Sequence, residues 1–301
     1  MGKRKGSVFD DVFRTICERL PHLLIPLINE TFGTDYPMNA EIVKLKNEHH
    51  LSEDRIVTDA YIKINEDAYH IECQSNDMQI MIVRMFEYDV TIALEEMKKT
   101  NEGFEIVLPK PCVVYLRGKK GPQRMKKLLI RFADGTTHDY SVEISEVQGY
   151  SINEIFEKKL LMFLPFYILR FEKKLPTGRI QDREKLKAFI KEFEDIKVAM
   201  EVSPECKDPE CYVKLCELIV KVSDFVCGSR NVVKKGVREI MGGKVLRLQS
   251  DIIKEEGKKE GETLLGKLVL KLMSLGKNDD VVKVSSDVKY REKLYTLYGI
   301  K

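Results

Sequence analysis

Alternation of apolar and polar residues is clearest in residues 57–75 (VTDAYIKINEDAYHIECQS). Apolar side chains occupy every second position from 60 to 64 and again from 69 to 73, and a polar Asn-Glu-Asp segment separates the two runs. A period of two is typical of half-buried strands, and the polar segment has turn chemistry. The pattern predicts a β-hairpin that brings Asp59 near Glu72.

The polar face of this predicted hairpin has an unusual composition. Acidic side chains are depleted in strands, so Asp59 and Glu72 in adjacent strands call for a reason, and metal binding is one. A solvated sheet face is the alternative. Gln74 shares the face of Glu72, so two acids and an amide converge. His70 lies on the same face and has two interpretations, a general base or a packed, hydrogen-bonded histidine.

Before and after the hairpin, the patterns alternate between helical and strand periods. Helical spacing predicts helices at residues 7–32, 79–99 and 152–171. The first is capped by Ser7 and broken at Pro21 and Pro26. Strands are predicted at 41–47, 111–117, 128–132 and 140–144, the last two flanking an Asp134-Gly135 turn. This order predicts an α/β domain with a central mixed sheet over residues 1–172.

Strand signals vanish beyond residue 172. Amphipathic helices are predicted at 183–199 and 209–226, and the Gly- and Lys-rich segment 230–243 has the composition of a linker. We therefore expect a helical region at 173–249. A charged, helical tail with glycines at 257, 261 and 266 follows at 250–301.

Composition narrows the classes of protein. With 43% hydrophobic and 33% charged residues, a soluble globular protein is expected. The longest apolar runs are roughly half the length of a membrane span, so no membrane association is expected. Seven scattered cysteines and a start without an apolar run favour reduced thiols in the cytoplasm. A net charge of +3 gives no overall attraction to nucleic acid, so any basic surface must be local.

Several short motifs, taken in order, resemble the recombination-promoting nuclease and transposase-like branch of the PD-(D/E)XK nuclease superfamily. They are FDDVF at 9–13, TD at 58–59, IECQ at 71–74, RMFEYD at 84–89, LPF at 164–166 and the tail EEGKKEGETLLG. The resemblance covers residues 7–172 and the tail. It implies a restriction-endonuclease-like core, and it implies Mg²⁺-dependent cleavage of DNA, with Mn²⁺ as a substitute cation.

The chemistry of phosphodiester hydrolysis agrees with these residues. Mg²⁺ prefers oxygen ligands and keeps several waters, so Asp59, Glu72 and the carbonyl of Cys73 form a suitable set. The superfamily usually has lysine where this chain has Gln74, which can hold a water but brings no positive charge. This departure, which also occurs in the branch that the chain resembles, puts the rate in doubt.

Accessory roles fall on residues in the flanking helices. Asp11 or Asp10 is a candidate accessory acid, and charge compensation at the helix start is the alternative. Arg84 is a candidate phosphate ligand or a salt-bridge partner of Glu87. Tyr88, one turn later, is expected to pack against Arg84 or to orient it.

A basic run at residues 117–131 contains seven Lys or Arg and no acid. It is a candidate DNA-backbone contact, and a solvated loop is the alternative. The residues assigned to DNA binding are Arg117, Lys119, Lys120, Arg124, Lys126 and Lys127.

Two further features of the sequence have alternative interpretations. Cys206, Cys211 and Cys216 recur every five residues, wider than zinc spacing and without a histidine nearby in the sequence, so ordinary buried or partly exposed thiols are expected. The leucines that follow the tail glycines allow a homodimer through the C-terminal region, against the alternative of a frayed tail with a short amphipathic end.

The competing hypothesis for the whole chain is a non-cleaving nucleic-acid-binding or assembly protein on a decayed nuclease scaffold, motivated by Gln74 and the small net charge.

Overall fold

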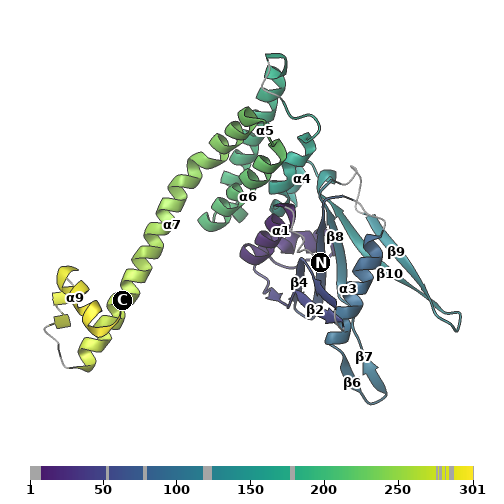
Figure 1. The fold of residues 1–301 in the computed structure, drawn as a ribbon, viewed down its shortest axis with the longest axis horizontal. Coiled ribbons are helices and arrows are strands. Elements are labelled where there is room, and N and C mark those ends of the chain that lie inside the picture. Colours follow the sequence, from purple (N-terminus) through teal and green to yellow (C-terminus); the bar gives the residue numbers. More distant parts are fainter. Residues whose placement is uncertain are drawn as a thin grey trace. The chain divides into compact units, whose positions relative to one another are not determined.

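The computed structural model describes residues 8–51, 54–76, 80–117, 124–176, 180–275, 277, 280–281, 283–284 and 288–300. The chain forms two compact units, of which the first ends at Gly242 and the second begins at Gly243. A single helix, α7 (Asn231–Ser274), begins in the first unit and continues into the second. The sheet and the candidate site belong to the first unit (Figure 1).

The centre of the first unit is a six-stranded mixed sheet, in the order β1-β4-β5-β8-β10-β9. Strands β5, β8 and β10 are parallel, whereas β1, β4 and β9 join in antiparallel pairs. Their bounds are β1 Val43–Lys44, β4 Ala60–Ile64, β5 Asp67–Gln74, β8 Lys110–Tyr115, β9 Arg124–Arg131 and β10 Thr137–Glu146. The prediction of an α/β fold around a mixed sheet is confirmed.

The predicted hairpin is the β4–β5 pair. Ala60 pairs with Ile71 and Ile64 with Asp67, so the turn has two residues. Asn65 in this turn adopts a φ of 54°, a left-handed conformation that asparagine tolerates better than most residues. The register places residues 68, 70, 72 and 74 on one face of β5, and residues 69, 71 and 73 on the other.

Helix α3 (Met81–Glu95) covers the face of the sheet that carries His70 and Glu72 (Figure 1). Its Met81 and Met85 pack into a buried apolar cluster formed with β8 and β10. The cluster includes Val113, which is the register partner of Glu72 on the neighbouring strand. Neighbours in register point to the same side of a sheet, so α3, the apolar cluster and Glu72 share one face.

Helices α1 (Val8–Arg19) and α2 (Leu24–Phe32) cover the opposite face. The ring of Phe32 lies 5.1 Å from that of Tyr69, and Cys17 lies close enough to Cys73 to influence its thiol electrostatically. A short 3₁₀ turn, Pro21–Leu23, separates the two helices, so the predicted break at Pro21 is confirmed. The predicted break at Pro26 is wrong, because Pro26 sits in the first turn of α2, where the missing N–H costs no hydrogen bond.

Other boundaries also differ from the predictions. The strand predicted at 41–47 is reduced to β1, and the helix predicted to reach residue 99 ends at Glu95. Two small sheets were missed. Their strands are β2 Glu48–Leu51, β3 Asp54–Val57, β6 Lys98–Thr100 and β7 Gly103–Glu105. The described residues of these strands are mostly polar or exposed, so they lack the alternation that a buried face imposes. Ser7 and Gln79 lie outside the described residues.

The segment predicted as one helix at 152–171 is two elements. Helix α4 (Ile152–Glu157) begins with a capping box formed by Ser151 and Glu154. The chain then turns through Lys159, which has a φ of 58°, into an 11-residue 3₁₀ helix, η3 (Leu161–Phe171), that contains Pro165. The apolar residues of η3 are almost all buried, so it is a core element of the first unit.

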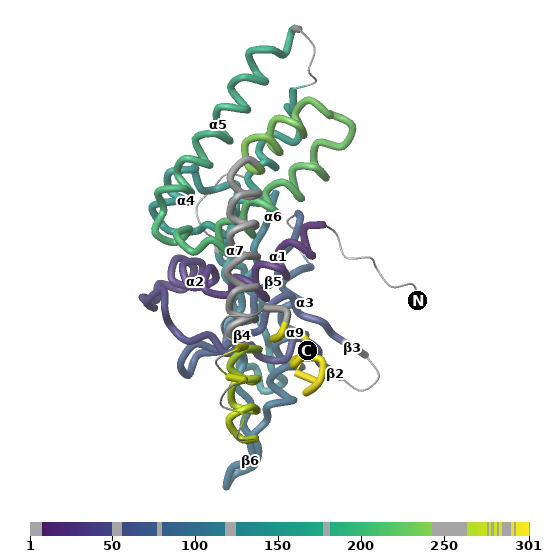
Figure 2. The backbone as a smooth tube through the Cα atoms, turned by 90° about the vertical axis from the view of Figure 1, so that its left-hand side faces the viewer, coloured from purple at the N-terminus to yellow at the C-terminus, as the bar shows by residue number. Residues whose placement is uncertain are grey.

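The helices after residue 172 pack onto the sheet domain. Helix α6 (Pro209–Cys227) contacts η3 and α1, and the ring of its Phe225 lies 5.3 Å from that of Phe9. Helix α5 (Arg183–Val202) precedes α6, and α5 lies at the end of the unit opposite to β6 (Figure 2). Both helices belong to the unit that contains the sheet. The remaining short 3₁₀ turns of this unit are η2 Val147–Gly149, η4 Ile180–Asp182 and η5 Pro204–Cys206.

The prediction of a linker at 230–243 is wrong, because this segment is the first part of α7. Val233, Val237 and Met241 are buried at a spacing of four residues, a helical signal that the glycines obscured. Gly236 has a packing role: a Cβ at this position would lie 2.3 Å from Cδ1 of Ile190 on α5. A larger residue here would require the Ile190 side chain to move.

The second unit contains the end of α7 and helix α9 (Val288–Tyr298). Leu268 and Leu272 are buried against Val284, Leu294 and Tyr295. Leu264 and Leu265 pack at the edge of this cluster, whereas Leu270 and Leu275 are exposed. Part of the leucine pattern is thus explained within one chain, and the homodimer stays a prediction. None of the described helices combines the length and the apolar character that crossing a membrane requires.

Candidate metal-binding site

Asp59 and Glu72 meet at the carboxyl end of β5. The backbone N–H of Asp59 donates to Oε1 of Glu72 at 2.9 Å, and the backbone N–H of Cys73 donates to Oδ2 of Asp59 at 3.0 Å. Both side chains are buried, with exposed fractions of 9% and 3%. The predicted convergence of the two acids is confirmed, and the alternative of a solvated sheet face is excluded.

The backbone opens beside this pair. Strand β4 begins at Ala60, so the side chain of Asp59 takes the place of a strand partner for the Cys73 amide. The N–H and C=O of one residue point to the same side of a strand, so the Cys73 carbonyl faces the gap beside Asp59. Gln74 follows, half-buried, on the face of Glu72, and its carbonyl accepts from the amide of Leu116 on the β8 side. Two carboxylates and one carbonyl therefore meet at this strand end, and Gln74 follows on the same face.

Burial and the neighbouring charge of Glu72 raise the pKa of Asp59 to about 7. The negative charge of Asp10 acts in the same direction, whereas the Cys73 amide and Arg14 oppose the rise. A cation bound beside such a carboxyl group stabilises its ionised form and offsets the cost of burying that charge next to Glu72. The electrostatics therefore favour a bound positive charge between the two acids.

His70 links Glu72 to helix α3. Its Nε2 lies 3.2 Å from Oε1 of Glu72, and its Nδ1 lies 2.6 Å from Oδ1 of Asp89. Burial lowers the pKa of His70, but the bonds to Asp89 and Glu72 outweigh burial and raise it to about 9. The interpretation as a packed, hydrogen-bonded histidine is confirmed. A histidine with this pKa is an imidazolium at neutral pH and is unsuited to act as a base.

Two arginines flank the carboxylates. Nη2 of Arg14, on α1, lies 3.8 Å from Oδ1 of Asp59, and the Arg14 side chain is 47% exposed. Arg84, on α3, donates from Nη2 to the Tyr88 hydroxyl at 2.9 Å, so the predicted orientation of Arg84 by Tyr88 is confirmed. Burial lowers the pKa of Arg84, whereas Tyr88 and the charges of Glu72 and Asp59 raise it, with a net increase. Arg14 therefore lies beside Asp59, and the negative charges of both acids act on Arg84.

The two acids at the start of α1 have different surroundings. Asp11 forms an ion pair with Lys221 of α6, so its carboxylate serves a contact between helices. Asp10 influences the pKa of both Asp59 and Cys73. Of the two alternatives for the accessory acid, Asp10 is the one that the structure brings to the site.

The Lys and Arg residues of the basic run have different partners. Arg117 binds Glu172 through two hydrogen bonds of 2.6 and 2.7 Å, and Lys127 pairs with Asp139 at 2.9 Å. Lys126 extends over the ring of Tyr115 at 5.3 Å, and Tyr115 is the register partner of Gln74 on the carboxylate face. Arg124 begins the edge strand β9, and Lys119 and Lys120 lie outside the described residues.

Within the described residues, no three or more His, Cys, Asp and Glu side chains are grouped in a way that could hold a metal ion. A cation beside Asp59 and Glu72 would therefore rely on two carboxylates, a carbonyl and water. That set suits Mg²⁺, which commonly binds one or two carboxylates and keeps several waters. It does not suit zinc, whose structural sites use four protein ligands.

Three cysteines gather near the start of α6. Cys206, Cys211 and Cys216 are buried and unoxidised, as expected. The structure does bring a histidine to them, because Sγ of Cys211 lies 3.7 Å from Nε2 of His22, from the turn after α1. Of these three cysteines, Cys206 lies on the 3₁₀ turn η5, and Cys211 and Cys216 lie on α6.

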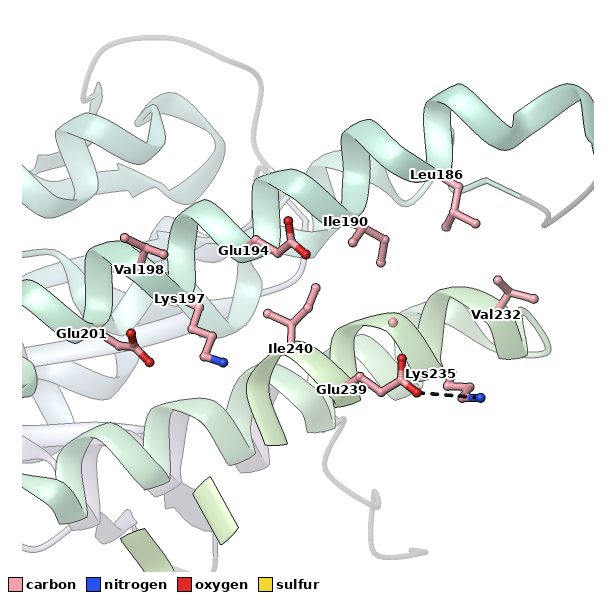
Figure 3. A pocket seen from close by; sticks show the side chains of 11 residues that line it. Leu186, Ile190, Glu194, Lys197, Val198, Glu201, Val232, Lys235, Glu239 and Ile240 are labelled. Carbon is pink, nitrogen blue, oxygen red and sulfur yellow. Dashed lines mark ion pairs between the residues drawn. The ribbon is translucent and has the colours of Figure 1, made fainter. Parts of the chain in front are cut away.

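A groove of about 880 Å³ lies apart from the carboxylates, between α5 and the start of α7. Figure 3 shows its lining, with Ile190 and Ile240 facing each other and charged side chains around them. A second hollow, of about 550 Å³, adjoins the β4–β5 turn and includes Lys63 and Asp67. Neither hollow includes Asp59 or Glu72.

The chain matches no protein-family model, no curated protein and no solved structure. The function must therefore be argued from the site itself.

The sequence assigned no role to three residues of the site: Arg14, Asp89 and Tyr140. Arg14 follows Asp10 by four residues on α1, so it shares the helix face of that acid. For Asp89 and Tyr140 no local signal exists, because each meets its partner only through the packing of α3 on the sheet.

Proposed function

We propose that this protein is a Mg²⁺-dependent DNA endonuclease of the recombination-promoting, transposase-like type, with Asp59, Glu72 and the Cys73 carbonyl as the metal ligands. The observation that carries the proposal is the burial of two acids side by side, at a strand end, with the pKa of Asp59 raised to about 7. A cation bound between the carboxylates of Asp59 and Glu72 would offset the electrostatic repulsion between them. The antiparallel hairpin, the helix α3 and the parallel strand β8 support a restriction-endonuclease-like core for this site.

Each remaining residue has a defined task in this proposal. When bound, Mg²⁺ supplies positive charge to the phosphate oxygens and makes water more acidic. Gln74 orients the attacking water through its amide. Arg14 and Arg84 hold the phosphate oxygens from two sides, and Lys126 adds a positive charge on the same sheet face. His70 is already protonated and holds Glu72 rather than accepting a proton.

A second candidate function is binding of DNA without cleavage. It is favoured by Gln74 at the position where the superfamily usually has lysine. The two candidates differ in the fate of the phosphodiester bond and share the DNA partner.

Nicking of supercoiled plasmid, measured with Mg²⁺, Mn²⁺ or EDTA, tests the first proposal. Glu72→Gln keeps an oxygen acceptor for the Asp59 amide but removes the charge, and Asp59→Asn does the same for the Cys73 amide. We expect each to reduce nicking at least about a hundredfold, which is about 2.7 kcal/mol in the barrier.

Glu66→Gln, in the exposed turn of the same hairpin, is the matched control and is expected to nick like the wild type. Wild-type protein that shifts duplex DNA in a gel without nicking it under either cation would replace the first function with the second. Nicking that survives EDTA or Glu72→Gln would remove the metal site from the mechanism.

A further inference from the structure

A continuous series of buried polar groups runs from strand β10 through helix α3 to the candidate metal ligand Glu72. The Tyr140 hydroxyl donates to Oδ2 of Asp89 at 2.5 Å, and Oδ1 of Asp89 lies 2.6 Å from Nδ1 of His70. Nε2 of His70 then reaches Oε1 of Glu72. His70 and Asp89 are completely buried, and Tyr140 is 7% exposed. The series therefore lies inside the protein and excludes water.

These contacts occupy most of the carboxylate oxygens of the series. His70 lies between two carboxylates, with one ring nitrogen at each. Asp89 then has both oxygens engaged, one by His70 and one by Tyr140. Glu72 has Oε1 engaged twice, by His70 and by the Asp59 amide. One carboxylate oxygen of Glu72, Oε2, remains for a ligand.

The other candidate ligand is held differently. Asp59 is fixed through Oδ2 by a single backbone amide, and Oδ1 faces a half-exposed arginine at 3.8 Å. The Glu72 carboxylate is thus held by a connected, buried network, and Asp59 by one short bond and one loose contact. Partners of this kind orient metal ligands and tune their basicity.

We propose that Tyr140, Asp89 and His70 act as positioning residues that hold the Glu72 carboxylate with Oε2 directed at the cation. The inference rests on the proposed function, because it assigns these residues to the metal site proposed above. A purely structural role would not require polar groups here, since burying them costs desolvation free energy that apolar groups of the same volume avoid.

The test measures Mn²⁺ affinity by isothermal titration calorimetry on the full-length chain, without DNA. Tyr140→Phe removes one hydroxyl, Asp89→Asn removes the charge that holds His70, and His70→Gln replaces the ring. Loss of such outer partners typically costs 10- to 100-fold in metal affinity, so we expect about tenfold for Tyr140→Phe and more for the other two.

Tyr69→Phe is the matched control. Tyr69 is a fully buried tyrosine of the same sheet, on the opposite face, and its hydroxyl is hydrogen-bonded to Tyr36 and Asp67. Its loss is expected to lower the melting temperature about as much as Tyr140→Phe, with the Mn²⁺ affinity unchanged. Melting curves of all variants separate lost folding from lost affinity.

The outcomes distinguish the inference from the function on which it rests. Wild-type binding that Glu72→Gln abolishes, together with wild-type affinity in Tyr140→Phe and Asp89→Asn, would overturn the positioning role and leave the metal site standing. Absence of Mn²⁺ binding to the wild-type chain would overturn both. A graded loss that increases from Tyr140 to His70 is the expected result.

Discussion

The two faces of strand β5 are separated by the thickness of one backbone, yet they have opposite contents. Toward α1 and α2, the strand presents Tyr69, Ile71 and Cys73, which are buried in an apolar layer. Toward α3, it presents His70 and Glu72, which are equally buried but charged and hydrogen-bonded. The eight residues of β5 therefore contribute to an apolar layer on one side of the sheet and to a polar, hydrogen-bonded layer on the other.

This difference between the two faces of β5 indicates which face stabilises the fold. Full burial of a large apolar side chain stabilises a protein by about 1.5–3 kcal/mol, so Ile71 and its neighbours anchor the strand. Burial of Glu72, Asp59 and Asp89 opposes folding unless each charge is paired. The apolar face thus holds rigidly a strand whose other face carries groups that are costly to bury.

Truncation of a side chain on the apolar face of β5 should have the largest effect on stability. Ile71 is completely buried, and Ile71→Ala is expected to lower the free energy of unfolding by about 3 kcal/mol through lost burial and a cavity. Its Mn²⁺ affinity below the melting transition should stay at the wild-type value. Urea denaturation measures the first quantity and calorimetry the second.

Leu129→Ala is the control, because Leu129 lies in the same sheet but is 57% exposed, and a change below about 0.5 kcal/mol is expected. A large loss of Mn²⁺ affinity in folded Ile71→Ala protein would show that the two faces are not independent.

The apolar face was also the part that the sequence revealed best. Alternation at residues 60–73 predicted the hairpin and the meeting of Asp59 with Glu72, since a slip of one residue would bury the wrong face. The polar network was not predictable, because Asp89 and Tyr140 reach His70 only after α3 packs onto β8 and β10. Strands β6 and β7 were missed for another reason: all their residues are exposed, so they show no alternation of apolar and polar positions.

The start of α7 gives the converse case. Its glycines suggested a linker, although a Cβ at Gly236 would clash with the side chain of Ile190 on α5. Composition describes the average of a segment, whereas the role of Gly236 depends on a single neighbouring side chain, that of Ile190. Residues whose role depends on a distant partner therefore stay beyond reach of a single sequence.

The charged face predicts a pH dependence of stability in the metal-free protein. The pKa of Asp59 is about 7 in the folded state and near 4 in unfolded chains. The folded state therefore binds the proton more tightly. This contribution to stability is complete below about pH 4 and is lost as the pH rises through 7.

Asp59→Asn removes this loss, and its amide oxygen still accepts from Cys73. At pH 8 we expect the variant to be more stable than the wild type by at least about 1.4 kcal/mol, the value of one pKa unit, with no advantage at pH 4. Urea unfolding in EDTA at both pH values gives the two differences. Parallel pH profiles would mean that Asp59 is not strained by Glu72.

The smallest effect is expected at the open edge of the charged face. Arg14 is half-exposed and 3.8 Å from Asp59, and exposed ion pairs contribute only about 0–1 kcal/mol. Arg14→Gln should therefore leave stability nearly unchanged. If Arg14 contacts a phosphate, the variant should weaken DNA binding several-fold and reduce the slope of log affinity against log salt by about one.

Arg238→Gln is the matched control, because Arg238 is also exposed and ion-paired, to Asp224, but lies on α7. Gel shifts over a salt series compare the two variants, and equal slopes would exclude Arg14 from the DNA contact. A reduced slope only for Arg14→Gln would place DNA at the exposed edge beside Asp59. Glu72, held from beneath by His70, would then be the fixed half of the site, and Asp59 with Arg14 the half that adjusts to the phosphate.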